Sequence, residues 1–86
     1  MKIKPKEVLL NIPITLMFSD YHEIPAFAEN INQLVNGKRK IKYEELGCLG
    51  GQYVGLFYMD RNDEFAELRA SFVAMIEEEE QAQWGK

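Results

Sequence analysis

The sequence predicts a small α+β domain of β-α-β-β-α order, in which a three-stranded mixed sheet carries two helices mainly on one face. Three stretches have the apolar pattern of strands, and two have apolar residues three and four apart, as in helices. A chain of 86 residues buries only roughly 60–65% of its extended surface, which suffices for one core. We therefore expect a single domain over residues 1–86.

The first expected strand covers residues 8–18, because every even-numbered residue in it is apolar. Pro13 has no N–H to give to a neighbouring strand, which favours a place at the sheet edge. The pattern breaks over residues 19–23, and Pro25 suits the first turn of a helix. This helix ends at Asn36-Gly37, and its apolar stripe comprises Ile24, Phe27, Ala28, Ile31, Leu34 and Val35.

The second expected strand covers residues 38–45, where Ile41 and Tyr43 share one face and charged residues share the other. Its lysines are typical of a protected edge strand. Residues 47–51, rich in glycine, predict the turn into a third strand over residues 52–59, although a short helical turn around Leu46 and Leu49 remains open. The third strand is apolar on both faces, so it belongs in the centre of the sheet. The first helix then makes a right-handed crossover, as in a split β-α-β unit.

Two helices on one face of the sheet leave the other face of the third strand uncovered. We expect this open face to bind another protein or a second copy of the chain, because large exposed apolar patches are uncommon on monomers. The alternative is that the helices lie on opposite faces and bury everything. The residues expected to contact the partner are Leu9, Met17, Tyr53, Phe57 and Met59.

The last helix has N-cap candidates in residues 60–63 and an apolar stripe that includes Phe65, Leu68, Phe72 and Ile76. A helix that runs to about Gln83 is roughly 33 Å long and projects past a three-stranded sheet. Negative charge is unfavourable at a helix C-terminus, which suggests a use in docking a basic partner, although a solvated helix end is the simpler reading. This end carries Glu77, Glu78, Glu79, Glu80 and Trp84.

The net charge of −4 is unevenly distributed, since residues 1–42 carry seven Lys or Arg against four Asp or Glu and residues 43–86 carry three against ten. The basic strand offers an alternative function in nucleic-acid binding, with Tyr43 available for stacking. Edge protection explains the same lysines, and the overall charge opposes a polyanion. The residues of this alternative are Lys38, Arg39, Lys40, Lys42 and Tyr43, with Lys2, Lys4 and Lys6 beside them.

The chain has no motif that specifies catalysis. Asp20, His22 and Glu23 have no zinc spacing, and their positions favour a turn and a helix entry, so we expect no metal and no cofactor. Cys48 lies among glycines, and no base is placed beside it, because His22 is the sole histidine. We expect no enzyme, although a small-ligand sensor with a pocket near Cys48 remains an alternative class.

Composition favours a folded domain of the cytoplasm. Hydrophobic residues make up 47% and charged residues 28%, which is ordinary globular usage. A single cysteine, the absence of a secretory signal and the lack of a long apolar run favour a reducing compartment and exclude an integral membrane protein. A regulator, inhibitor or adaptor fits best, and small acidic domains of this kind are often accessory proteins of bacteria or phages, although no residue points to a source.

Overall fold

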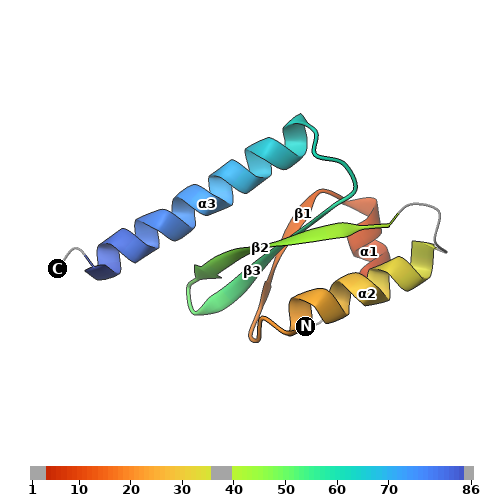
Figure 1. Cartoon of the computed structure of the whole chain (residues 1–86), viewed down its shortest axis with the longest axis horizontal. Coiled ribbons are helices and arrows are strands. Elements are labelled where there is room, and N and C mark those ends of the chain that lie inside the picture. The colour runs from red at the N-terminus through yellow and green to blue at the C-terminus, as the bar shows by residue number, and fades with distance from the viewer. Residues whose placement is uncertain (1–3, 36–39, 85–86) are drawn as a thin grey trace.

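The computed structural model describes residues 4–35 and 40–84 of the chain. These residues form a small α+β domain with the order α-β-α-β-β-α, which confirms the fold class. The elements are α1 (Pro5–Leu10), β1 (Ile14–Phe18), α2 (Glu23–Val35), β2 (Lys42–Leu49), β3 (Gln52–Tyr58) and α3 (Asp63–Trp84) (Figure 1).

The N-terminal half of the first expected strand is a helix instead. Residues 8–18 were expected as one strand, but α1 ends at Leu10 and β1 begins only at Ile14. Pro5 stands at the start of α1, where a missing N–H costs nothing. The Asn11 side chain donates a hydrogen bond to the Glu7 carbonyl at 2.7 Å and closes the last turn. The segment therefore forms a helix, although its apolar residues alternate as in a strand.

The strand order is β1-β3-β2, so the doubly apolar strand is central, as predicted. β3 pairs antiparallel with β1 and with β2, which makes β1 and β2 parallel to each other with β3 between them. This is the arrangement of a split β-α-β unit. Every hydrogen-bonded pair of neighbouring strands is antiparallel, so the sheet is not mixed.

The hairpin between β2 and β3 is tighter than expected. The turn was predicted over residues 47–51, but β2 continues to Leu49 and only Gly50 and Gly51 connect the strands. Both have positive φ, 59° and 79°, as a two-residue hairpin turn requires. Gly47 lies in a β-bulge, where the register shifts by one residue after Glu45. β2 was predicted to begin at residue 38, and residues 38–39 lie outside the described residues.

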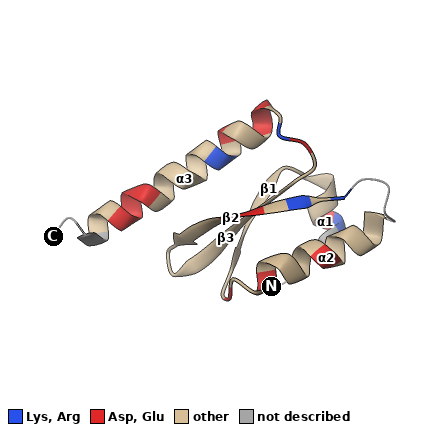
Figure 2. Ribbon diagram, viewed as in Figure 1, with Lys and Arg blue, Asp and Glu red and all other residues tan. Residues whose placement is uncertain are grey.

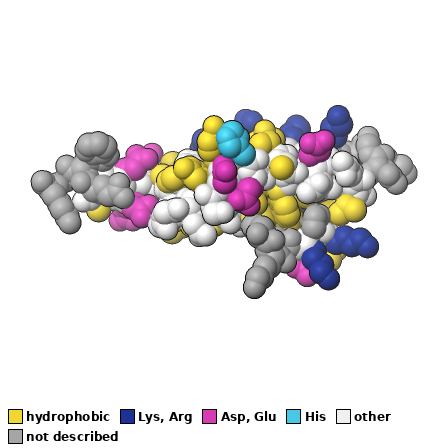
Figure 3. Space-filling model, turned by 90° about the horizontal axis from the view of Figure 1, so that it is seen from below, with side chains coloured by type: hydrophobic (Ala, Val, Ile, Leu, Met, Phe, Trp, Pro, Cys, Tyr) yellow, Lys and Arg dark blue, Asp and Glu magenta, His cyan; other side chains and the backbone are white. Residues whose placement is uncertain are grey.

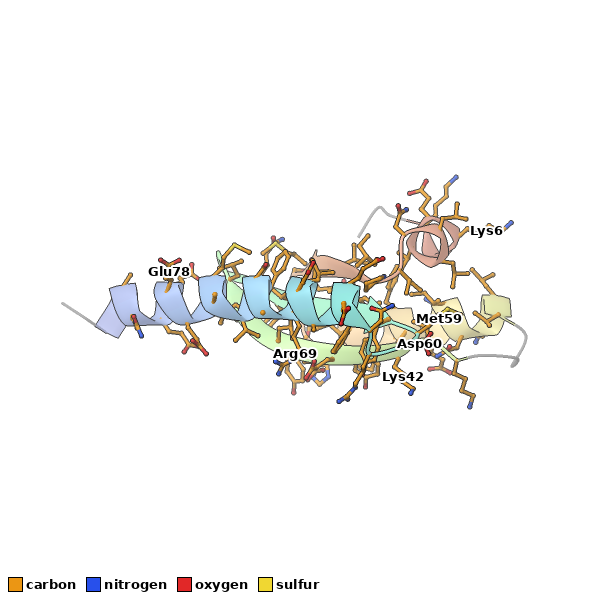
Figure 4. The ribbon with its side chains drawn as sticks, turned by 90° about the horizontal axis from the view of Figure 1, so that it is seen from above. Lys6, Lys42, Met59, Asp60, Arg69 and Glu78 are labelled. Carbon is orange, nitrogen blue, oxygen red and sulfur yellow. The ribbon has the colours of Figure 1, made fainter. Side chains whose placement is uncertain are left out.

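The helices cover opposite faces of the sheet, so the expectation that both pack mainly on one face is wrong. α1 and α2 lie on one side and α3 on the other (Figures 1 and 4). A Cβ on Gly55 of β3 would lie 3.1 Å from the Ile24 side chain of α2. A Cβ on Gly47 of β2 would lie 3.2 Å from the Ile76 side chain of α3. Two hydrophobic clusters result, one on each face.

β3 is therefore buried on both faces within one chain. Phe57 packs with Phe18 and Phe27 on the α2 side, with ring centroids 6.1 and 5.5 Å apart from its own. Leu56 faces the other way and clusters with Phe65 of α3. Neither residue has any accessible surface. The physical reason is that an 86-residue domain gains most by covering its most apolar strand twice.

α3 begins at a side-chain cap and runs along the hairpin. The Asn62 side chain accepts the Phe65 N–H at 2.9 Å, which satisfies one of the free amides of the first turn. Phe65 and Ile76 are buried, and Leu68 lies partly buried between them. The C-terminal end of the helix extends past the hairpin, as predicted (Figure 1). It reaches Trp84, one residue beyond the expected end.

Candidate protein-binding surface

The residues expected to form an open sheet face do not form one. Phe57 is fully buried, so it contacts no partner in this structure. Leu9, Tyr53 and Met59 are partly buried and pack against the cluster on the α2 side. Met17 is half-buried and points to the α3 face, as the partner of Val54 in the sheet. Because both faces of β3 are covered, the reasoning that singled out these five residues fails.

The acidic helix end divides into one structural glutamate and an exposed group. Both carboxylate oxygens of Glu79 accept the Gly50 N–H at 3.0 Å, which ties α3 to the hairpin turn. Glu77, Glu78 and Glu80 are exposed. In Figure 4, Glu78 points to the side of α3 opposite Arg69. The side chain of Trp84 lies outside the described residues, so its part in this surface stays a prediction.

The outer edge of β2 is one of the two edges of the sheet, and it lies beside a groove. Among the described residues, no strand pairs with β2 on the side away from β3. A groove of about 720 Å³ runs over this edge between β2 and α2. Mostly apolar side chains line it, and Tyr43 within it is 41% exposed. The lining residues are Pro25, Ala28, Glu29, Asn32, Lys40, Ile41, Lys42, Tyr43 and Tyr58.

One end of this edge is closed by Asn32 of α2. The Ile41 N–H donates to Asn32 Oδ1 at 2.6 Å, and Asn32 Nδ2 donates to the Ile41 carbonyl at 3.1 Å. The amide thus binds the main chain as a neighbouring strand would. In a strand, residues two apart point their N–H and C=O groups to the same side. Tyr43 therefore presents its main-chain groups on the side where Asn32 meets Ile41, and no side chain within residues 4–35 and 40–84 caps them.

Charged side chains flank the groove. Lys40 and Lys42 of the predicted nucleic-acid surface line it, whereas Lys38 and Arg39 lie outside the described residues. On the α3 face, Glu44 accepts a hydrogen bond from Arg69 Nε at 2.7 Å. This hydrogen bond and the charge of Glu44 raise the pKa of Arg69. Figure 4 places Arg69 and Lys42 on the same side of α3.

A second, smaller hollow of about 270 Å³ lies farther along the same side of β2. The rings of Tyr21 and Tyr53 are 5.8 Å apart at 62°, and Glu45 completes the wall. The ring of His22 lies 4.2 Å from that of Tyr21. Cys48 is exposed and pairs with Tyr53 across the hairpin. The sequence singled out Tyr53 and, for the small-ligand alternative, a pocket near Cys48. It missed Tyr21, Glu45 and Asn32, because a turn tyrosine and a helix asparagine carry no periodic signal.

The candidate metal ligands serve the turn before α2. The Asp20 carboxylate accepts the His22 N–H at 2.9 Å, and Glu23 accepts the Ser19 hydroxyl at 2.9 Å. Over residues 4–35 and 40–84, no three side chains of His, Cys, Asp or Glu are grouped as metal ligands would be. Within the same ranges, no helix has the length and apolar character needed to cross a membrane.

Comparisons with protein-family models, with curated proteins and with solved structures find no match to this chain. The chemistry of its own surface is therefore the basis for any function. Of that surface, the open edge of β2 with its apolar groove is the part best suited to a macromolecular partner.

Proposed function

We propose that the chain is a small non-enzymatic protein-binding domain, acting as a regulator, inhibitor or adaptor. It takes up an extended segment of another protein, or of a second copy, along the outer edge of β2. The observation that carries this proposal is the open edge beside the apolar groove. An edge strand offers unpaired N–H and C=O groups, which are a template for an added strand.

The groove adds specificity, which main-chain hydrogen bonds alone do not give. Strand addition gives affinity through hydrogen bonds, while specificity comes from pockets that hold alternate side chains of the added strand. The half-exposed Tyr43 is an amphipathic anchor of the kind that interfaces favour. Asn32 ends the available edge at Ile41, which sets where an added strand must stop.

A second copy of the chain is the first candidate partner. Two β2 strands related by a two-fold axis would pair antiparallel. The axis would lie past Tyr43 toward Leu49, because a second strand centred on Tyr43 would place its Glu45 against Ile41, whose main-chain groups are already bonded to Asn32.

The exposed glutamates of α3 support orientation of a partner. Glu77, Glu78 and Glu80 are exposed near the C-terminal end of α3. Figure 2 shows this acidic end of α3 well apart from the basic residues at the start of β2. The described residues span 49 Å along their longest axis, so this separation gives the domain a strong charge asymmetry. Such asymmetry steers the approach of a charged partner more than it adds affinity.

Nucleic-acid binding is the second candidate, because Lys40, Lys42 and Tyr43 line one groove. Glu29 lines the same groove, and Glu44 and Glu45 follow along β2. These carboxylates would repel phosphates, which disfavours this alternative.

Size-exclusion chromatography with light scattering, across concentration and at low and high salt, tests the proposal. We expect a dimer that Tyr43→Lys dissociates and that the matched change Leu34→Lys, at an exposed leucine of α2, leaves intact. A wild-type monomer would rule out the second copy. A photo-reactive side chain at position 43 that then captures no protein, while RNA or DNA is retained at low salt, would overturn the proposal in favour of the alternative.

A further inference from the structure

The hollow between Tyr21, Tyr53 and Glu45 has the shape and chemistry of a site for a cation. Two tyrosine rings meet at 62° with centroids 5.8 Å apart, so they form two walls of a corner. Tyr21 is 48% exposed, which leaves its ring open to a ligand. The buried residues Ile24 and Val54 form part of the lining, and Glu45 supplies a carboxylate.

We propose that this hollow binds the ammonium group of a lysine side chain on the partner protein, with preference for the methylated form. The faces of aromatic rings are electronegative and attract cations that are weakly hydrated. A methylated ammonium sheds water easily and fills an apolar corner, while Glu45 neutralises its charge. The inference rests on the proposed function for the source of the cation, but not for the site itself.

The surroundings favour positive ligands. Asp20 and Glu23 lie in the turn that carries Tyr21, and both are engaged in that turn by hydrogen bonds. Figure 2 shows basic residues on α1 and at the start of β2, whereas the turn before α2 is acidic. Figure 3 shows the histidine beside hydrophobic side chains, with acidic groups close to it. Among the described residues, Glu45 is therefore the only charged side chain that lines the hollow.

His22 is a positioning residue for this site. Its ring lies 4.2 Å from that of Tyr21 and tilted by 31°. The Asp20 carboxylate accepts the main-chain N–H of His22 at 2.9 Å, which fixes the turn. The Tyr21 ring therefore contacts the rings of both His22 and Tyr53. Such preorganisation lowers the entropic cost of binding a ligand.

NMR titration with three small probes tests the site. The probes are Nα-acetyl-Nε-trimethyllysine methylamide, its uncharged isostere ending in a tert-butyl group, and choline. We expect saturable shifts of the Gly47, Tyr53 and Val54 amides with the trimethyllysine probe and binding at least tenfold weaker with the isostere. Choline binding as tightly as the lysine probe would reassign the site to free ammonium compounds and overturn a lysine ligand. Equal binding of probe and isostere would show that charge is not recognised and overturn the site.

Two variants and a control test which residues bind the trimethyllysine probe. Tyr21→Leu and Glu45→Gln should each weaken binding of the trimethyllysine probe about fivefold. Leu10→Ala changes an exposed leucine of α1, outside both proposed sites, and should leave probe binding unchanged. Far-UV circular dichroism checks that each variant is folded. Unchanged binding in both Tyr21→Leu and Glu45→Gln would refute the site, whether or not the domain pairs through β2.

Discussion

The Asn32→Ala variant tests whether the edge of β2 is held by α2. Ile41 is 3% exposed, and both of its main-chain polar groups bond to the Asn32 amide. Removing that amide costs the net value of two hydrogen bonds, about 0.5–1.5 kcal/mol each. We therefore expect the free energy of unfolding to lie about 2 kcal/mol below that of a control alanine variant without this contact, and the Tm to lie roughly 8–16 °C below it for a domain of this size.

The matched control is Asn30→Ala, on the exposed side of the same helix. Alanine is a better helix former than asparagine by about 0.5 kcal/mol, so both variants share that gain. Their difference isolates the contact with Ile41. Urea unfolding followed by far-UV circular dichroism measures both free energies. If Asn32→Ala is as stable as Asn30→Ala, the Asn32 amide does not anchor β2, and the account of the closed edge is wrong.

Two further predictions concern the contacts of α2 and α3 with the sheet and its hairpin turn. Gly55→Ala should lower the free energy of unfolding by about 1–3 kcal/mol in urea, because its Cβ would lie 3.1 Å from the Ile24 side chain in a packed core; an unchanged value would mean that α2 does not press on β3 there. Glu79→Gln should speed hydrogen exchange of the Gly50 amide about threefold, because the charge-assisted bond to this amide is weakened. Glu78→Gln is the control, and equal exchange in the two variants would exclude the helix-to-turn contact.

Much of the fold could be predicted from the apolar pattern. The central place of β3 follows from its two apolar faces, and the order β1-β3-β2 follows from that place. α2 and α3 were recognised because their stripes continue for three turns or more. α1 was not, because six residues are too few to distinguish a helical stripe from alternation. Val8 is buried and Leu10 is 86% exposed, which strand alternation cannot produce.

The position of α3 could not be predicted by the same reasoning. Four residues link β3 to α3, and either face of the sheet is within their reach. The side on which α3 packs is decided by the free energy gained when Val54, Leu56 and Tyr58 are buried. These residues stand on the face that α2 leaves uncovered. A partner was inferred instead for the opposite face of β3, through Tyr53, Phe57 and Met59. Both apolar faces of β3 do need a cover, but α2 and α3 of the same chain provide it.

The proposed binding site for a partner is therefore the edge of the sheet and not its face. A three-stranded open sheet always has two edges, and which strands form them is known only once the strand order is known. Of the basic residues that suggested protection, the described ones, Lys40 and Lys42, stand at the start of β2, where Asn32 already closes the edge. Farther along, no side chain of the described residues caps Tyr43 in this way. Recognition through main-chain hydrogen bonds needs no side-chain motif, so a chain without any motif can still bind a strand. Selectivity then has to come from the side chains beside the edge, of which Tyr43 and the Tyr21–Tyr53 corner are the most distinctive.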